Sequence, residues 1–237
     1  MRIVFLNCYS GQILSPLLEF LKKQSLSTDI FCFSEVSGNL QKKFTEVLKN
    51  FSYVFELGGL ITDCNELCGQ TIFVKKGINI INSDKISIHE IKTNDVGFLL
   101  KTVLVINKTT ISIGNIHGTS APADKKDTEE RLKQSKIIID SFNIDTNKII
   151  VGDFNLSNDT QSVKLFENAG YKNLIKDFEV KSTRNEVSWN RFKNEPGFFK
   201  QYYADYCFVS SNIKVKSFEV PYNEVSDHLP LILEFEI

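Results

Sequence analysis

The segment SDHLPLILEF, residues 226–235, places a carboxylic acid and an imidazole side by side where a loop enters a strand. Asp227 and His228 come shortly before Leu231–Phe235, whose alternating side chains are typical of a strand with one buried face. A Ser-Asp-His triplet arises often by chance. Its meaning therefore depends on how the other strands of the chain end.

Four other apolar runs also end in polar side chains, which a buried strand does not need. Those side chains are, in chain order, Asn7, Glu35, His117, and the pair Asp153 and Asn155. Carboxylates, amides and imidazoles gathered at strand ends are typical of sites that hold hard divalent cations and phosphate groups. The sequence therefore indicates a site to which several strands contribute.

In this chain order, the pieces resemble motifs of the endonuclease/exonuclease/phosphatase superfamily, which includes the DNase I-like and exonuclease III-like metal-dependent phosphoesterases. The matching pieces are Leu6-Asn7, Phe33-Ser34-Glu35-Val36, Asn115-Ile116-His117, Gly152-Asp153-Phe154-Asn155, Ala204-Asp205-Tyr206-Cys207-Phe208-Val209-Ser210 and Ser226-Asp227-His228. They extend from residue 7 to residue 228, so the resemblance covers nearly the whole chain. It implies a DNase I-like fold of class α/β (α+β), a four-layer sandwich of two packed mixed β-sheets flanked by helices.

The hydrophobic pattern alternates short apolar runs with helical periods. Strands are predicted near residues 2–7, 29–34, 71–75, 99–106, 110–116, 148–152, 203–209 and 230–236, and helices near 12–24, 39–50, 127–142 and 160–169. In the third helix the apolar spacing predicts a buried face formed by Leu132, Lys136, Ile139 and Phe142, with Lys125, Lys126, Glu129 and Glu130 outside. The fourth helix is predicted to end at Gly170.

Length and composition are those of an ordinary globular protein. The 237 residues, 42% hydrophobic and 24% charged, predict one catalytic domain over residues 1–237. A net charge of -1 argues against a strongly basic protein that coats nucleic acid. No apolar stretch approaches the roughly 18 residues of a membrane span, and residues 3–6 are too few for a signal peptide.

The cysteines are expected to be structural. Five reduced thiols and the lack of a signal peptide predict a cytoplasmic protein. Cys64 and Cys68 could ligate a metal, but a single C-x-x-x-C with no second half-site is a weak signal.

The resemblance implies that the residues at the ends of the first two predicted strands hold the metal. Glu35 is expected to be the main ligand of Mg²⁺ or Mn²⁺, with Asn7 beside the metal and the phosphate. Some relatives carry an aspartate two residues after that asparagine, where this chain has Tyr9, so a metal shell rich in water is expected. Asp153 is expected to orient or deprotonate the attacking water, and Asn155 to hold a phosphate oxygen or a metal-bound water.

Two of the three histidines fall on the family motifs. His117 and His228 are expected to donate hydrogen bonds to the negative charge of the transition state. The resemblance makes Asp205 the partner that fixes the tautomer of His228, and leaves Asp227 near the metal or its waters. The third, His89, is expected at the surface.

The resemblance also exposes one departure from the DNase I branch. There a glutamate pairs with the first histidine, and the corresponding slot here holds Gly69 or Gln70. Phosphate binding is therefore expected for His117 instead of proton transfer.

The segment from Lys181 to Lys200 is expected to face the substrate, because it lies directly before the strand of Asp205. It carries a local excess of basic residues around the only tryptophan, Trp189. Arg184 and Arg191 are expected to hold phosphates, while Trp189 stacks on a base or shields an apolar leaving group. The alternative is a solvated loop whose aromatic residues cover the sheet edge.

Together these features predict a metal-dependent phosphodiesterase that attacks P–O bonds with water. A DNA or RNA endonuclease or exonuclease is the first expectation, with a phosphodiester, most often nucleic acid, as the partner and no obligate protein partner. The alternative is a phosphatase or phosphodiesterase for an inositol phosphate, a lipid or a protein–DNA adduct. A catalytically silent binding module on the same fold is the remaining alternative, although such a module would usually have lost some of the ligands.

Overall fold

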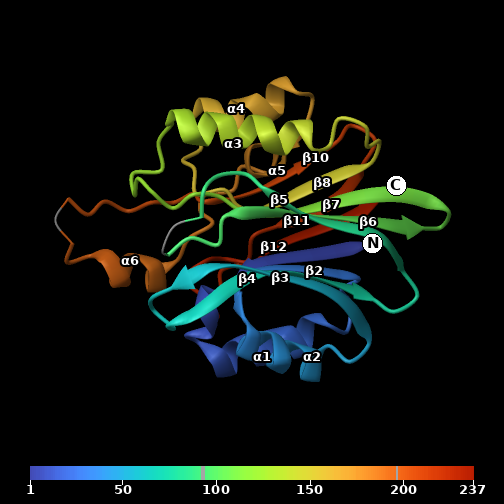
Figure 1. The fold of residues 1–237 in the computed structure, drawn as a ribbon, viewed down its shortest axis with the longest axis horizontal. Coiled ribbons are helices and arrows are strands. Elements are labelled where there is room, and N and C mark those ends of the chain that lie inside the picture. The colour runs from blue at the N-terminus through green and yellow to red at the C-terminus, as the bar shows by residue number, and fades with distance from the viewer. Residues whose placement is uncertain (92–93, 196) are drawn as a thin grey trace.

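The computed structural model describes residues 1–91, 94–195 and 197–237. Two six-stranded mixed sheets pack against each other, and helices cover their outer faces (Figure 1). The first sheet has the order β11 (Lys214–Glu219), β12 (Leu231–Glu236), β1 (Arg2–Asn7), β2 (Ile30–Ser37), β4 (Glu66–Lys75), β3 (Phe51–Ile61). The second has the order β5 (Asn79–Ser87), β6 (Phe98–Ile106), β7 (Thr109–His117), β8 (Lys148–Asp153), β10 (Asp205–Val209), β9 (Lys172–Asn173). The predicted DNase I-like four-layer sandwich is confirmed.

Two hydrophobic cores explain why the central strands are apolar on both faces. In β1, Ile3 and Phe5 belong to the core between the sheets, whereas Val4 and Leu6 belong to the core beneath α1 (Leu14–Gln24) and α2 (Gly38–Val47). Successive side chains of a strand point to opposite faces, so both faces need apolar residues. The pairing of β1 with β2 is parallel, which sets Asn7 opposite Ser34.

The helices of the other outer layer are α3 (Glu129–Asp140), α4 (Gln161–Asn168) and α5 (Leu174–Asp177) (Figure 1). Thr128 and Thr160 cap the first two, each accepting a hydrogen bond from a backbone N–H of the first turn. Gly170 follows α4 with a φ of 86°, as a residue that ends a helix does. None of the described helices has both the length and the apolar character that crossing a membrane requires.

The buried face of α3 differs from the predicted one. The helix buries Arg131, Gln134, Ser135 and Ile138. Periodicity of apolar residues failed here because Arg131 donates hydrogen bonds to the carbonyls of Lys126 and Pro122, both at 2.6 Å. A buried guanidinium satisfied in this way replaces an apolar side chain.

Strands β3, β5, β9 and β11 lie outside the predicted set. They are the edge strands of the two sheets, and β5 is exposed or half-buried along its whole length. An edge strand of this kind carries polar side chains on both faces, so hydrophobic periodicity does not reveal it.

Candidate active site

Five strands and one loop bring their polar residues to one end of the sandwich. Asn7 ends β1, and His117 and Asp153 end β7 and β8, where the strand register places them opposite each other. Asp205 begins β10 and also lies opposite Asp153. The site thus joins residues of both sheets, and Glu35 and His228 complete it from β2 and from the loop before β12.

A β-bulge sets the direction of Glu35. The register between β2 and β4 shifts between Ser34 and Val36, and Glu35 has a φ of 56°. A bulge leaves the extra residue unpaired and turns its side chain, which is common beside active sites. Burial opposes ionisation of Glu35, but the hydrogen bond and charge of His117 outweigh it and lower the pKa of Glu35 to about 2.

The amide of Asn7 connects the carboxylates of the two sheets. Its Nδ2 donates to Oε1 of Glu35 at 2.9 Å and to Oδ2 of Asp153 at 3.0 Å. Its Oδ1 accepts a hydrogen bond from the backbone N–H of Tyr9 at 3.0 Å, which fixes the orientation of the amide. Two carboxylates that share one amide group are held close together.

Gly152 allows Asp153 to reach this position. A Cβ on Gly152 would lie 2.3 Å from the carbonyl oxygen of Ile116, so only glycine permits β8 to approach β7 this closely. Burial raises the pKa of Asp153, but the positive charge of His228, His117 and nearby cations prevails and lowers it to about 2. Asp153 is therefore a carboxylate at neutral pH.

Both atoms of the Asn155 side-chain amide form hydrogen bonds with other residues of the protein. Its Nδ2 donates to the carbonyl oxygen of Gly118 at 2.9 Å, and its Oδ1 accepts a hydrogen bond from Nζ of Lys125. Lys125 was expected outside the core, but it is buried against the site. Burial lowers the pKa of Lys125 to about 8, against the opposing charge of Asp153.

His117 has a carboxylate that the sequence did not reveal. Its Nε2 lies 3.2 Å from Oε1 of Glu35, and its Nδ1 lies 3.8 Å from Oδ1 of Asp95. Neither Gly69 nor Gln70 supplies a carboxylate, but Asp95 approaches His117 from the connection between β5 and β6. Burial alone would lower the pKa of His117, but Asp95 and Glu35 raise it to about 10.

His89 stands behind Asp95 and is not a surface residue. It is 9% exposed, and its Nε2 lies 3.5 Å from Oδ1 of Asp95. The residue was expected at the surface because it falls on none of the family motifs. The structure shows that this end of the chain segment turns inward toward His117.

His228 lies between a carboxylate and a guanidinium. Its Nδ1 is 2.8 Å from Oδ2 of Asp205, and its Nε2 is 2.9 Å from Nη1 of Arg184. Asp205 is fully buried, and burial raises its pKa despite the opposing effect of His228. The neighbouring hydroxyl of Ser226 donates to the carbonyl of Asn7 at 2.6 Å, which ties this loop to β1.

Two arginines face Asp227. Nη2 of Arg184 lies 3.5 Å and Nη1 of Arg191 lies 3.7 Å from its Oδ2. The guanidinium of Arg191 also covers the ring of Tyr9, 4.7 Å from its centroid, and forms an ion pair with Asp63 of the β3–β4 turn. These contacts place Asp227 at the basic side of the site.

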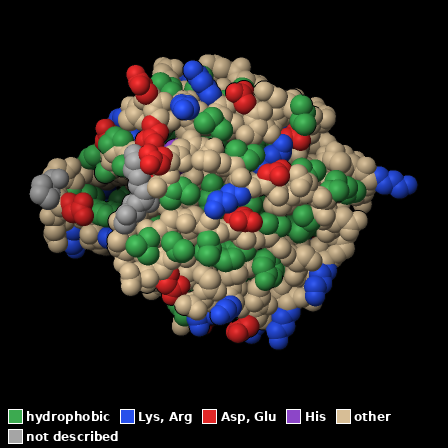
Figure 2. Space-filling view, viewed as in Figure 1, with side chains coloured by type: hydrophobic (Ala, Val, Ile, Leu, Met, Phe, Trp, Pro, Cys, Tyr) green, Lys and Arg blue, Asp and Glu red, His purple; other side chains and the backbone are tan. Residues whose placement is uncertain are grey.

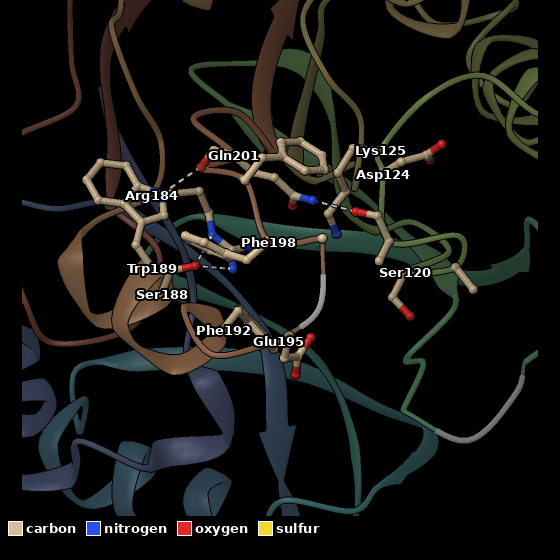
Figure 3. Close-up of a pocket in the computed structure, with 14 residues that line it drawn as sticks. Ser120, Asp124, Lys125, Arg184, Ser188, Trp189, Phe192, Glu195, Phe198 and Gln201 are labelled. Carbon is tan, nitrogen blue, oxygen red and sulfur yellow. Dashed lines mark hydrogen bonds between the residues drawn. The ribbon is translucent and has the colours of Figure 1, made fainter.

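The segment 181–200 contains a helix, α6 (Glu186–Phe192), and only part of it is a surface loop. Arg184, expected to hold a phosphate, is 7% exposed and lies in the wall of the site instead of on an open loop. It is buried because Ser188 accepts hydrogen bonds from its Nε at 3.0 Å and from its Nη2. Trp189 and Arg184 both line a pocket beside the site (Figure 3).

The donor set suits a hard divalent cation. Ligand atoms of Glu35, His117 and Asp153 lie within 4.8 Å of one another, and so do those of Asp153, Asp205 and His228. Asp205 and His228 are joined by a hydrogen bond in the second group, and His117 lies 3.2 Å from Glu35 in the first, so the carboxylates of Glu35 and Asp153 are the candidate oxygen ligands of the first group. Mg²⁺ is usually bound by one or two carboxylates and keeps several waters, and Glu35 and Asp153 offer two carboxylates.

A model of the Endonuclease/Exonuclease/phosphatase family matches residues 4–228. No curated protein sequence matches the chain. An endonuclease/exonuclease/phosphatase family protein from Leptotrichia buccalis C-1013-b has a TM-score of 0.79 at 14% identity, over 100% of both chains. TDP2 of D. rerio, complexed with single strand DNA product, has a TM-score of 0.78 at 15% identity, over 100% of this chain and 99% of that one. A mannosyl-6-phosphatase from Bacteroides thetaiotaomicron VPI-5482 has a TM-score of 0.69 at 16% identity, over 100% of both chains. Similarity at these identities is similarity of fold.

Proposed function

This chain belongs to the endonuclease/exonuclease/phosphatase family, and we propose that it is a metal-dependent phosphodiesterase that hydrolyses P–O bonds with water. The observation that carries the proposal is the contact of Asn7 with both Glu35 and Asp153, which joins carboxylates of the two sheets. Such a cluster is unfavourable in a site that only serves packing, because like charges repel in a buried environment.

Glu35 and Asp153 would hold the cation, with Asn7 keeping the two carboxylates at a fixed separation. A bound Mg²⁺ or Mn²⁺ would polarise a phosphoryl oxygen and stabilise the charge that develops on it. Asp227 remains a proposed ligand of the metal or of its waters. The two arginines beside it support a position close to the phosphate.

Asp153 is the proposed residue for the attacking water. With a pKa of about 2 it is a weak base, so it accepts a hydrogen bond from water and orients it more readily than it removes a proton. Orientation is valuable by itself, since the attacking oxygen must lie in line with the leaving oxygen.

The basic side of the site would stabilise the transition state. His117, with a pKa of about 10, is an imidazolium at neutral pH and can donate to a phosphoryl oxygen. Lys125 and Arg184 add two buried positive charges, and Asn155 holds Lys125 in place. Preorganised donors in a partly buried site are usually the largest contribution to catalysis of this type.

A DNA or RNA nuclease remains the first proposal for the substrate, supported by the likeness to TDP2 complexed with single-stranded DNA. The alternative, an enzyme for a phosphate ester outside nucleic acids, is supported by the likeness to a mannosyl-6-phosphatase. The face in Figure 2 shows basic and acidic side chains interspersed, without one continuous basic stripe, and the net charge is -1. Both observations favour a short substrate over a long duplex. A single catalytic domain over residues 1–237, a cytoplasmic location and independence of a protein partner remain predictions.

A panel of esters tests the proposal: duplex and single-stranded DNA, RNA, a 5′-tyrosyl DNA end, sphingomyelin, inositol phosphates and a chromogenic phosphodiester, each with Mg²⁺ or Mn²⁺. We expect hydrolysis of at least one, and its loss in the Asp153→Asn variant. A protein that hydrolyses none of them, or that keeps its full rate after Asp153→Asn, is not the proposed enzyme.

A further inference from the structure

We propose that the pocket lined by Trp189, Phe192 and Phe198 receives the aromatic ring of the group esterified to the scissile phosphate, so that the enzyme takes its substrate at an end. The proposal rests on the phosphoesterase function proposed above and specifies its substrate. The pocket lies between residues 120–125 and residues 184–201 and has a volume of about 460 Å³. That volume is within the range of sites for a single small molecule.

The aromatic wall is already formed without a ligand. Nε1 of Trp189 donates to the carbonyl oxygen of Gln201 at 2.9 Å, and its indole meets the ring of Tyr202 edge to face, with centroids 5.3 Å apart. The side chain of Gln201 in turn donates to the carbonyl of Ala123, which joins the two sides of the pocket. Figure 3 shows Trp189 and Lys125 on opposite sides with Phe198 between them. A wall fixed in advance binds a flat ring without an ordering penalty.

Two cations link the pocket to the catalytic residues. Lys125 and Arg184 both line the pocket, and the same side chains contact Asn155 and His228 of the site. A phosphate placed on these two cations is therefore shared by the pocket and the site. The group esterified to that phosphate then lies among the aromatic side chains.

The other charged residues of the pocket are acidic. Asp124 and Glu195 line it together with the aromatic residues, and Asp124 also forms an ion pair with Arg131 over 3.5 Å. A second phosphate on the far side of the bound group would meet these carboxylates. Repulsion between like charges therefore disfavours a chain that continues through the pocket, and favours a terminal, uncharged group.

The expected ligand is thus a phosphate ester of a group that carries one aromatic ring. Two sources share this chemistry, a nucleoside at the end of a nucleic acid and a free-standing aryl ester. Both present a flat ring next to a phosphate, and stacking on aromatic side chains tolerates either. The experiment has to separate them.

Trp189 is the only tryptophan of the chain, so its fluorescence reports directly on the pocket. We would titrate the protein with thymidine 5′-phosphate, phenyl phosphate, ribose 5-phosphate and inorganic phosphate, once in EDTA and once with Ca²⁺. Thymidine 5′-phosphate, phenyl phosphate or both should bind about tenfold or more tightly than ribose 5-phosphate, the size that stacking of one ring provides. Tight binding of the thymidine ligand alone identifies a nucleoside, and equal binding of both identifies any aryl ester. Equal affinity of all the organic phosphates in both conditions overturns the proposal.

Thymidine 3′,5′-bisphosphate tests whether Asp124 and Glu195 repel a second phosphate. We expect it to bind no better than thymidine 5′-phosphate, although it carries more negative charge. A clear gain in affinity from the second phosphate would contradict end-directed binding.

Variants connect the preference to the pocket. Phe198→Ala should remove most of the preference for the aromatic ligand and leave the affinity for inorganic phosphate unchanged. Phe178→Ala, which removes an exposed ring outside the pocket, is the matched control and should behave as the wild type. Phe198→Leu, which keeps the volume but removes the ring, should resemble Phe198→Ala if the alanine variant is well folded by circular dichroism. A preference retained in both Phe198 variants would overturn the proposal. Binding is measured without turnover, so a failure here is distinct from a failure of the ester panel.

Discussion

Nη1 of Arg184 donates a hydrogen bond to Nε2 of His228 over 2.9 Å. A guanidinium has no acceptor, so Nε2 must present its lone pair and the ring proton must lie on Nδ1, where Asp205 accepts it at 2.8 Å. The tautomer of the imidazole is therefore fixed from both sides in this contact. Burial and Arg184 lower the pKa of His228, but the carboxylates of Asp205, Asp153 and Asp227 prevail and raise it, so the ring binds a second proton readily once Arg184 leaves Nε2. For His228 to donate to a phosphoryl oxygen, Arg184 has to move from Nε2 to the phosphate, which carries the stronger negative charge.

Arg184→Ala should consequently reduce kcat and not only weaken binding. Removal of one preorganised donor from a site of this kind typically lowers kcat by about 10²–10³-fold. Lys181→Ala, which removes an exposed cation of the same segment, is the control and should change kcat by less than about twofold. Steady-state kinetics at fixed ionic strength separates the two. Equal effects of both variants would show that Arg184 acts only through its general positive charge.

Asp205 and His228 should act as a unit. Asp205→Asn keeps the shape of the side chain but loses the charge that selects the tautomer, and kcat should fall by about 10²–10⁴-fold. The double variant with His228→Ala should be little worse than either single variant, because groups that work together are not additive. A fully multiplicative loss in this double-mutant cycle would show that the two residues contribute independently.

Hydrolysis should require a divalent cation held by Glu35. EDTA should abolish activity and Mg²⁺ or Mn²⁺ should restore it. Mg²⁺ should also raise the Tm of the wild type, because a ligand that binds only the folded state stabilises it. Glu35→Gln should lose both effects, whereas Glu46→Gln, on the exposed side of α2, should keep them. Full activity in EDTA would remove the metal from the mechanism.

The residues that the sequence predicted well share one property: each ends an apolar strand. The register of the paired strands brings Asn7, His117 and Asp153 to the same end of the sandwich. The position of each residue at the end of its strand therefore determines its position in the site. Hydrophobic pattern therefore predicted both the central strands and the place where their polar ends meet. Glu35 fits the same rule only because a bulge turns it into the site.

The residues that the sequence could not place come from connections between elements. Asp95, Lys125 and Arg184 lie in irregular segments, where neither periodicity nor a motif fixes the direction of a side chain. Lys125 looked like an ordinary solvent-exposed cation, and the burial of Arg184 against the site was not predicted, since burial of a charge depends on partners distant in sequence such as Asn155 and His228. A lysine next to an aspartate and a second lysine gives no signal that distinguishes it from its neighbours.

The Cys64 and Cys68 thiols should be spectators. Their sulfur atoms lie 3.5 Å apart as free cysteines, and burial raises the pKa of Cys68, which disfavours the reactive thiolate at neutral pH. The variant with both changed to Ser should keep its activity and bind no zinc, as measured by kinetics and by elemental analysis. Cys207→Ser, which puts a hydroxyl into the core, should instead lower the Tm. Stoichiometric zinc in the wild type that disappears from the double variant would contradict this interpretation.

Lys125 should cause kcat/KM of the enzyme to fall at alkaline pH. Because burial lowers its pKa to about 8, the side chain is a cation below that pH and neutral above it. Its contribution to phosphate binding is therefore present on the acidic side and lost as the pH rises through about 8, so kcat/KM of the wild type should fall there.

Variants of the adjacent residues Lys125 and Lys126 test whether Lys125 causes this fall in kcat/KM. Lys125→Met removes the charge at every pH, so its kcat/KM should be well below that of the wild type at pH 7 and approach it near pH 10. Lys126→Met removes an exposed lysine paired with Asp159 and should keep the wild-type profile. The kcat/KM profile reports the ionisations of the free enzyme, which is the state in which Lys125 contacts Asn155. An alkaline limb that persists unchanged in Lys125→Met would assign it to another group.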